Sequence, residues 1–363
     1  MRSIIALAFA AAAAAAQIPT DPIKAAFDAL NQGRYLEAAD GFANAAFDEN
    51  GAVRDQSAFQ MWRQFSPFIT NELDLATLER LDGSKSAPPD FERSARIAAA
   101  RPRDAIPEIV RRARATSIVI LNEAHHSPRD RAFALEVARA LRPLGYSVLA
   151  AETFRNEESD ASSPSTVERL RADGFVRLDT GTYTKDPVYA DFVREALALG
   201  YRPVAYEQTP SQDPPGSGVE AREQAQADNL MARVFARDPK AKVLVFVGHS
   251  HVAEAPAPKS TGGKTEWMAA RLKRMTGLDP LTIDQTGLTD LSSATRTARA
   301  EAARRLGDRP AVLFDGDRPL VLGQYAGMVD LEIVHPRRAY RYGRPRAYFE
   351  LTDSAGIPKA ALI

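Results

Sequence analysis

The sequence predicts an α/β protein whose mostly parallel sheet is covered by helices on both faces. Short apolar runs, such as 117–121 and 243–247, alternate along the chain with longer stretches in which apolar residues have helical spacing. Strands that are apolar on both faces are typical of buried parallel sheets. Parallel neighbours need long crossover connections, and the helices between the strands supply them.

The expected elements follow one another in a regular order from residue 104. They are a helix over 104–115, a strand over 117–121, a helix over 129–145, a strand over 147–151, a helix over 186–200, a strand over 203–206, a helix over 220–236 and a strand over 243–247. After these come a helix over 265–277, strands over 280–284, 311–314 and 320–323, and a more irregular stretch over 330–352. We therefore expect one α/β domain over 104–363, with a mixed-strand edge near its end.

The first sixteen residues, 1–16, have the composition of a secretory signal peptide. Arg2 precedes an apolar run that is too short to span a bilayer, and small residues lead to Gln17. No later segment is apolar over the roughly 18 residues that a membrane helix needs, so we expect no membrane span. The chain has no cysteine, and a core of this size does not need disulfides. We expect a periplasmic or secreted protein that begins near residue 17.

Residues 17–81 are expected to form a helical accessory segment in front of the α/β domain. Small and aromatic residues have the spacing of a helical hairpin around a turn at 31–33, and the segment resembles a single tetratricopeptide unit. One such unit cannot bury its own apolar face. We therefore expect it to pack on the main domain or to bind a protein partner, and we expect a linker over 82–103.

The overall charge gives no indication of a polyanionic partner. Lysine and arginine together number 47, and so do aspartate and glutamate. A balanced chain creates no general attraction to nucleic acid or to an anionic membrane. We therefore expect no nucleic-acid partner and look for function in a local site.

Titratable side chains gather where the four central strands are expected to end. Four of the five histidines lie at two of these strand ends. The residues at the four strand ends are Glu123, His125 and His126, then Glu152, then Glu207, and finally His249 and His251. Because ligands of open parallel sheets bind outside the carboxyl ends of the strands, we expect these side chains to converge in one pocket.

The helix expected over 220–236 adds polar residues to the same edge. Arg222, Gln226 and Asn229 follow one another at helical spacing and form a stripe beside the apolar face. Arg222 lies in the first turn, near the strand ends, where its guanidinium can bind a carboxylate or a developing oxyanion.

These motifs resemble those of the superfamily that contains erythromycin esterase, the ChaN-like haem-uptake proteins and Tiki. Glu123 and His126 match the E-x-x-H of the esterase branch, and Glu152 matches its second carboxylate. Residues 220–231 and 243–252 match its late segment, so the resemblance covers about 104–254. Glu123 and His125 equally match the E-x-H of the haem-uptake branch. Asn122 in place of the usual glycine and the two-residue spacing of His249 and His251 depart from the family pattern.

The main expectation is a secreted hydrolase that cleaves an ester, lactone or amide bond of a small molecule or peptide. The chain has no cysteine and no G-x-S-x-G motif, which favours direct attack by water. The E-x-x-H spacing makes His126 the expected base, oriented by Glu123 or Glu152. The expected catalytic residues are Glu123, His126, Glu152, Arg222 and His251.

The remaining polar residues of this edge have expected supporting roles. The expected substrate-binding residues are Arg131, Glu207, Gln226 and Asn229. His125 and His249 are the expected ligands if a divalent metal (zinc, manganese or iron) takes part. The alternative function is a ChaN-like haem- or metal-binding protein without catalysis. A third reading is a partner-docking protein with a vestigial site.

Overall fold

The computed structural model describes most of the chain, in two compact units that comprise residues 1–62 and 63–363. The described residues are 21–66, 90–157, 164–216, 218–259, 262–286, 297–298, 301–302, 304–307, 309–336, 339–341 and 344–351. The expected signal peptide and residues 82–89 of the expected linker lie outside these ranges. Within them, no helix is long and apolar enough to cross a membrane.

The first unit contains helices α1 (Pro22–Asn31) and α2 (Tyr35–Ala46), and α3 (Gln56–Phe65) begins in it. α1 and α2 pack closely at Gly41, which has no side chain. A Cβ built on Gly41 would lie only 2.9 Å from the Cβ of Ala26. The assignment of this segment to a tetratricopeptide-like helical hairpin stays a prediction.

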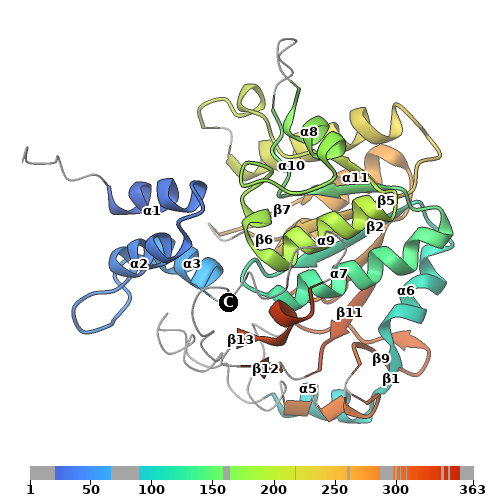
Figure 1. Cartoon of the computed structure of the whole chain (residues 1–363). Coiled ribbons are helices and arrows are strands. Elements are labelled where there is room, and N and C mark those ends of the chain that lie inside the picture. The colour runs from blue at the N-terminus through green and yellow to red at the C-terminus, as the bar shows by residue number, and fades with distance from the viewer. Residues whose placement is uncertain are drawn as a thin grey trace, which may run out of the picture. The chain divides into compact units, whose positions relative to one another are not determined.

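The second unit is an α/β domain with a mixed, mostly parallel central sheet (Figure 1). Its strand order is β1-β9-β11-β8-β2-β5-β3-β4, and β10 pairs with β9. The strands are β1 (Arg101–Asp104), β2 (Ile118–Glu123), β3 (Val148–Ala151), β4 (Arg202–Val204), β5 (Val243–Gly248), β8 (Leu281–Asp284), β9 (Ala311–Asp315), β10 (Arg318–Pro319) and β11 (Leu331–Val334). From β11 through β4 all neighbours are parallel, whereas β9 is antiparallel to β1, β10 and β11.

Alternate residues of the central strands are buried on opposite faces of the sheet. In β2, Val119 and Leu121 belong to one apolar cluster, and Ile118 and Ile120 belong to another. This is the period-two alternation of a strand that is buried on both faces.

Helices cover both of these faces, as Figure 1 shows. The first cluster includes residues of α6 (Ala105–Ala113), α7 (Pro128–Leu141) and α9 (Pro187–Ala198). The second includes α10 (Gly218–Leu230), the π-helix η5 (Met231–Phe235) that continues it, and α11 (Met268–Thr276). The expected α/β class with a mostly parallel sheet is confirmed.

Two stretches differ from the sequence-based expectation. Within the range expected as a linker, helix α5 (Phe91–Ala99) forms and leads into strand β1 at the edge of the sheet. β1 has no apolar pattern because it is a partly exposed edge strand that contains Pro102. The strand expected over 320–323 is not formed, and the short β10 pairs with β9 just before it.

The remaining elements are short, and most lie in the loops around the sheet. They are η2 (Arg142–Leu144), α8 (Thr166–Asp173), η3 (Tyr183–Lys185), η4 (Pro210–Gln212), η6 (His249–Val252), β6 (Ala257–Pro258), β7 (Lys264–Thr265), η7 (Gly323–Tyr325), β12 (Tyr340–Arg341), β13 (Arg344–Pro345) and η8 (Arg346–Phe349). Two of them, η6 and η3, contribute residues to the candidate site described next.

Candidate active site at the carboxyl edge of the sheet

The chain makes a tight turn directly after β2, and the turn separates the two neighbouring histidines. The amide of Ser127 donates to the carbonyl of Ala124 at 2.7 Å, so His125 and His126 occupy the two central positions of the turn. The carboxylate of Asp130 fixes the turn by accepting from the Ala124 amide at 3.1 Å and from the Ser127 hydroxyl at 2.7 Å.

His125, not His126, forms the expected pair with Glu123. Its Nδ1 lies 2.9 Å from Glu123 Oε1. His126 is half-buried and its Nε2 lies 2.9 Å from a guanidinium nitrogen of Arg63, the first residue of the second unit. The structure therefore places His125 beside Glu123 in the position expected for His126, because the turn directs the two imidazoles to different surroundings.

Arg131 on α7 holds the Glu123 carboxylate from the other side. Its Nε donates to Glu123 Oε2 at 2.7 Å, and its Nη1 donates to Asp186, the N-cap of α9. Burial alone would raise the pKa of Glu123, but the charges of Arg131 and His125 outweigh it and lower that pKa. Glu123 is therefore a buried anion whose two oxygens bind His125 and Arg131.

Tyr183 of η3 lies over the free face of the His125 ring. The two rings stack at 4.1 Å with 16° between their planes, and the tyrosine hydroxyl lies 3.2 Å from His125 Nε2. Burial and the nearby Glu152 carboxylate raise the pKa of Tyr183, so the phenol stays protonated.

A second group of charges follows β3 and β4. Arg222, in the first turns of α10, donates to Glu152 Oε1 at 2.8 Å and to Glu207 Oε1 at 3.1 Å. Gln226 donates to both oxygens of Glu207 at 3.1 Å. Although burial raises it, the pKa of Glu152 falls to about 2 because His251, His125 and Arg222 favour the anion.

A second imidazole and carboxylate pair follows β5. His251 Nδ1 lies 2.9 Å from Oε2 of the fully buried Glu223, which also accepts from the Met268 amide at 2.8 Å. The other ring nitrogen, Nε2, lies 3.3 Å from Arg222 Nη1 and 3.8 Å from Glu152 Oε1. Burial lowers the pKa of His251, but Glu223 and Glu152 outweigh it, so the net change is upward.

Gly248 at the end of β5 brings the two halves of the site together. A Cβ built on it would lie 2.6 Å from His125 Nε2 and 3.0 Å from Glu152 Oε2. Both side chains therefore approach the same point above the glycine, and any larger residue would fill it. The Gly248 amide also donates to Glu152 Oε2 at 2.5 Å.

The next residue is His249. Among the non-glycine residues that the structure describes, it alone has a positive φ, at +30°. The Asn122 amide fixes this backbone by donating to the His249 carbonyl at 3.0 Å. The His249 ring lies 5.5 Å from the His125 ring in an edge-to-face arrangement. Desolvation by the surrounding protein and the positive charge of a protonated His125 both disfavour a charged His249. They lower the pKa of His249 to about 4, which keeps this imidazole neutral.

The structure thus places most of the predicted site residues at one edge, in two linked groups. Three residues predicted to bind substrate are buried instead: Arg131 is 1 % exposed, Gln226 0 % and Asn229 7 %. Arg131 and Gln226 hold carboxylates, and Asn229 donates to the Glu207 carbonyl at 3.0 Å. These side chains fix the positions of other site residues.

Four further residues of the site were missed by sequence reasoning. They are Tyr183, Asp186, Glu223 and Gly248. Asp186 before Pro187 is a recognisable helix start, and Glu223 follows Arg222 directly in the sequence. Tyr183 comes from a loop with no pattern, and only the close approach of His125 makes a glycine necessary at 248.

No metal centre is found in the described part of the chain. Among those residues, no group of three or more histidine, aspartate or glutamate side chains is placed to hold a metal ion. Among the described residues, the expected metal-ligand roles of His125 and His249 therefore have no support. The haem-binding alternative stays a prediction.

The comparisons with known proteins contradict the resemblance predicted from the sequence. No family model and no curated protein match the chain. One solved structure that matches is described as bacterial protein toxins. It has 18% identity and a TM-score of 0.37, and the match covers 72% of this chain and 57% of that chain. The predicted membership of the erythromycin esterase, ChaN-like and Tiki group is therefore wrong.

Two other toxin structures are similar at the same loose level. RRSP, a MARTX toxin effector domain from Vibrio vulnificus, has 17% identity and a TM-score of 0.36 over 74% of this chain and 59% of that chain. The C-terminal region of Pasteurella multocida toxin, described as having a thiol-protease-like catalytic triad, has 13% identity and a TM-score of 0.33 over 65% of this chain and 32% of that chain. This chain therefore spans less than two thirds of each of these proteins.

Proposed function

We propose that this protein is a hydrolase of ester, lactone or amide bonds that activates water with His125. The observation that carries the proposal is a repeated pair of an imidazole and a buried glutamate, Glu123 with His125 and Glu223 with His251. The two imidazoles follow the neighbouring strands β2 and β5, and Glu223 comes from α10. In each pair the carboxylate binds Nδ1, which fixes the tautomer. The other ring nitrogen, Nε2, faces the Tyr183 hydroxyl in His125 and Arg222 in His251, and a water molecule or substrate would take the place of these contacts when it binds.

The two imidazoles have environments that suit opposite roles. His125 is 24 % exposed in its side chain and can reach a water molecule, whereas His251 has a raised pKa and favours the imidazolium. Two titratable groups with different environments are the usual basis of acid and base assignments. His125 is therefore the proposed base and His251 the proposed acid.

The reaction then follows from these two roles. His125 Nε2 takes a proton from water while the water oxygen forms a bond to the carbonyl carbon. The exposed part of Arg222, with 36 % of its side chain accessible, stabilises the oxyanion. The bond from carbon to the leaving oxygen or nitrogen breaks, and His251 supplies its proton. The chain has no cysteine, so no thiol nucleophile takes part.

The test compares His125→Ala with His126→Ala, a matched control one residue away. The purified protein is assayed with an activated ester, a lactone and a peptide amide. We expect His125→Ala to lower turnover by about 10²- to 10⁴-fold, the usual contribution of a general base, and His126→Ala to have little effect. Failure of all three bond types to turn over, or an equal effect of the two variants, would contradict the proposal.

A further inference from the structure

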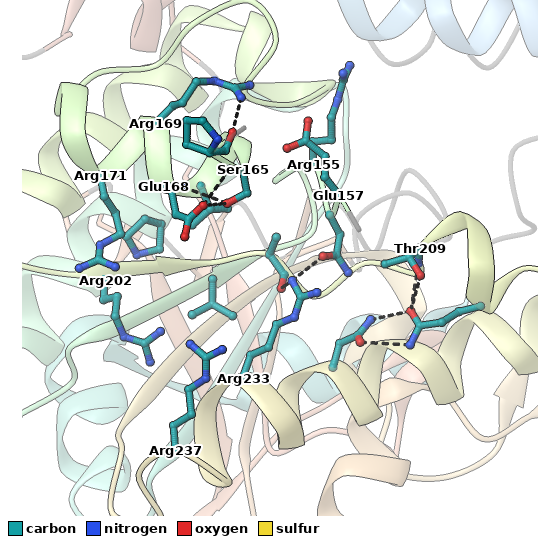
Figure 2. Close-up of a pocket in the computed structure, with 18 of the residues that line it drawn as sticks. Arg155, Glu157, Ser165, Glu168, Arg169, Arg171, Arg202, Thr209, Arg233 and Arg237 are labelled. Atoms are coloured by element: carbon teal, nitrogen blue, oxygen red, sulfur yellow. Dashed lines mark hydrogen bonds between the residues drawn. The ribbon is translucent and has the colours of Figure 1, made fainter. Parts of the chain in front are cut away.

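An arginine-rich cavity lies beside β4, one of the two edge strands of the sheet (Figure 2), and no residue of the two histidine pairs lines it. Its volume is about 820 Å³, within the usual range for a small-ligand pocket. Of the residues predicted for the active site, Asn229 alone lines it. The cavity is therefore a separate feature with its own lining.

The lining is strongly cationic although the whole chain is neutral. It contains six arginines and two acidic residues, which are Arg155, Arg169, Arg171, Arg202, Arg233 and Arg237, with Glu157 and Glu168. The arginines come from the loop after β3, from α8, from β4, from η5 and from the turn that follows η5, and Figure 2 shows them around the same hollow. Segments far apart in the sequence thus supply one concentrated positive charge.

The two acidic residues do not neutralise these arginines through hydrogen bonds. Glu157 accepts from the amide and the hydroxyl of Thr166 at 2.7 and 2.8 Å, at the start of α8. Glu168 accepts from the amide and hydroxyl of Ser165 at 2.8 and 3.0 Å, as part of a capping box. Both carboxylates are occupied with the N-terminus of α8.

Four of the six guanidinium groups form no hydrogen bond or ion pair with any residue that the structure describes. They are those of Arg155, Arg171, Arg202 and Arg237. Burial lowers the pKa of Arg202, and the neighbouring charges of Arg237 and Arg171 lower it further. Burial and Arg237 act in the same way on Arg233. Like charges held together in this way repel one another, and an anion between them would relieve the repulsion.

We propose that this cavity binds a small ligand that carries phosphate groups. Guanidinium groups bind phosphate oxygens through paired hydrogen bonds, and several of them around one hollow suit a ligand with more than one phosphate. The ligand can be a soluble phosphate ester or a phosphorylated lipid headgroup, since both present the same chemistry. The proposal is independent of the hydrolase activity.

The test measures binding of inorganic pyrophosphate by titration calorimetry, with citrate at the same ionic strength as the comparison. The double variant R202Q/R237Q removes two of the unpaired guanidinium groups. R114Q/R318Q is the matched control, because Arg114 and Arg318 are exposed and lie outside the cavity lining. We expect R202Q/R237Q to weaken pyrophosphate binding by about a hundredfold, which is about tenfold for each lost guanidinium, and R114Q/R318Q to bind like the wild type.

Thermal unfolding without ligand gives a second readout. R202Q/R237Q should unfold at the same or a higher temperature than the wild type, because it relieves repulsion between like charges. Vesicles of phosphatidylcholine with and without phosphatidylinositol phosphate then separate a lipid source from a soluble one, and either result agrees with the proposal. No pyrophosphate binding, equal binding of citrate, or equal loss in R114Q/R318Q would overturn it.

Discussion

Replacing Gly248 by alanine is a direct test of how the site is assembled. The new Cβ would lie 2.5 Å from His125 Cε1 and 2.6 Å from Nε2, closer than two such atoms can approach. The backbone at Gly248 is ordinary, with φ at −84°, so the substitution introduces no backbone strain. We expect the imidazole to move because it is nearer to the new atom than the Glu152 carboxylate, whose Oε2 would lie 3.0 Å away.

The size of the effect follows from what holds His125 in place. Overpacking a tight site usually costs about 1–3 kcal/mol, and loss of a hydrogen bond to a charged group costs a similar amount. We therefore expect Gly248→Ala to lower the free energy of unfolding by about 1–3 kcal/mol. If His125 is the base, a displacement of about 1 Å should also lower turnover by about 10²-fold.

The assay is a double-mutant cycle measured by urea unfolding. In a His125→Ala background the imidazole is gone, so Gly248→Ala should cost much less than in the wild type. In a His126→Ala background the full cost should remain, because the three atoms nearest to the new Cβ belong to His125 and Glu152. An equal cost of Gly248→Ala with and without His125 would refute the reasoning.

The remaining predictions concern protonation. The pKa of Glu152 is about 2 in the folded protein, against an ordinary value of 4.5, so its contribution is present above the ordinary value and is lost as the pH falls towards 2. Glu152→Gln should therefore flatten the loss of unfolding free energy over this acid range, a difference on the order of 3 kcal/mol, and urea unfolding at a series of pH values measures it. The pKa of His251 is raised, so its contribution is present below its ordinary value and is lost as the pH rises through the raised one. An NMR titration of the imidazole should place its midpoint above 6.5, and Glu223→Gln should lower that midpoint; an unchanged midpoint would exclude Glu223 as the cause.

The sequence allowed the sheet, and the edge at which the titratable side chains gather, to be predicted, because both depend on local patterns. Apolar runs identify strands, and residues that follow parallel strands must share an edge. The choice between His125 and His126 depended on the turn at Ala124 and Ser127, whose geometry no periodic pattern encodes. One signal was available: side chains two residues apart on an extended chain share a face, which favours His125 as the partner of Glu123.

Contacts between segments that are distant in the chain could not be predicted from the sequence. Tyr183 stacks on His125 from a loop, and Asn122 fixes the carbonyl of His249 from a neighbouring strand. Such contacts follow from how loops and strands pack, so a single sequence gives no indication of them. The buried positions of Arg131 and Gln226 have the same origin.

The two outer strands of the sheet share a chemistry that limits how this protein can associate. β1 contains Pro102 between two arginines, and β4 contains Pro203 directly after Arg202. Proline offers no amide hydrogen, and charged side chains on an edge oppose close approach by another strand. Neither border can therefore be extended readily by a β-strand from another chain, which protects the protein against edge-to-edge aggregation. A peptide that binds at either border is therefore expected to be recognised through side chains and not through strand addition.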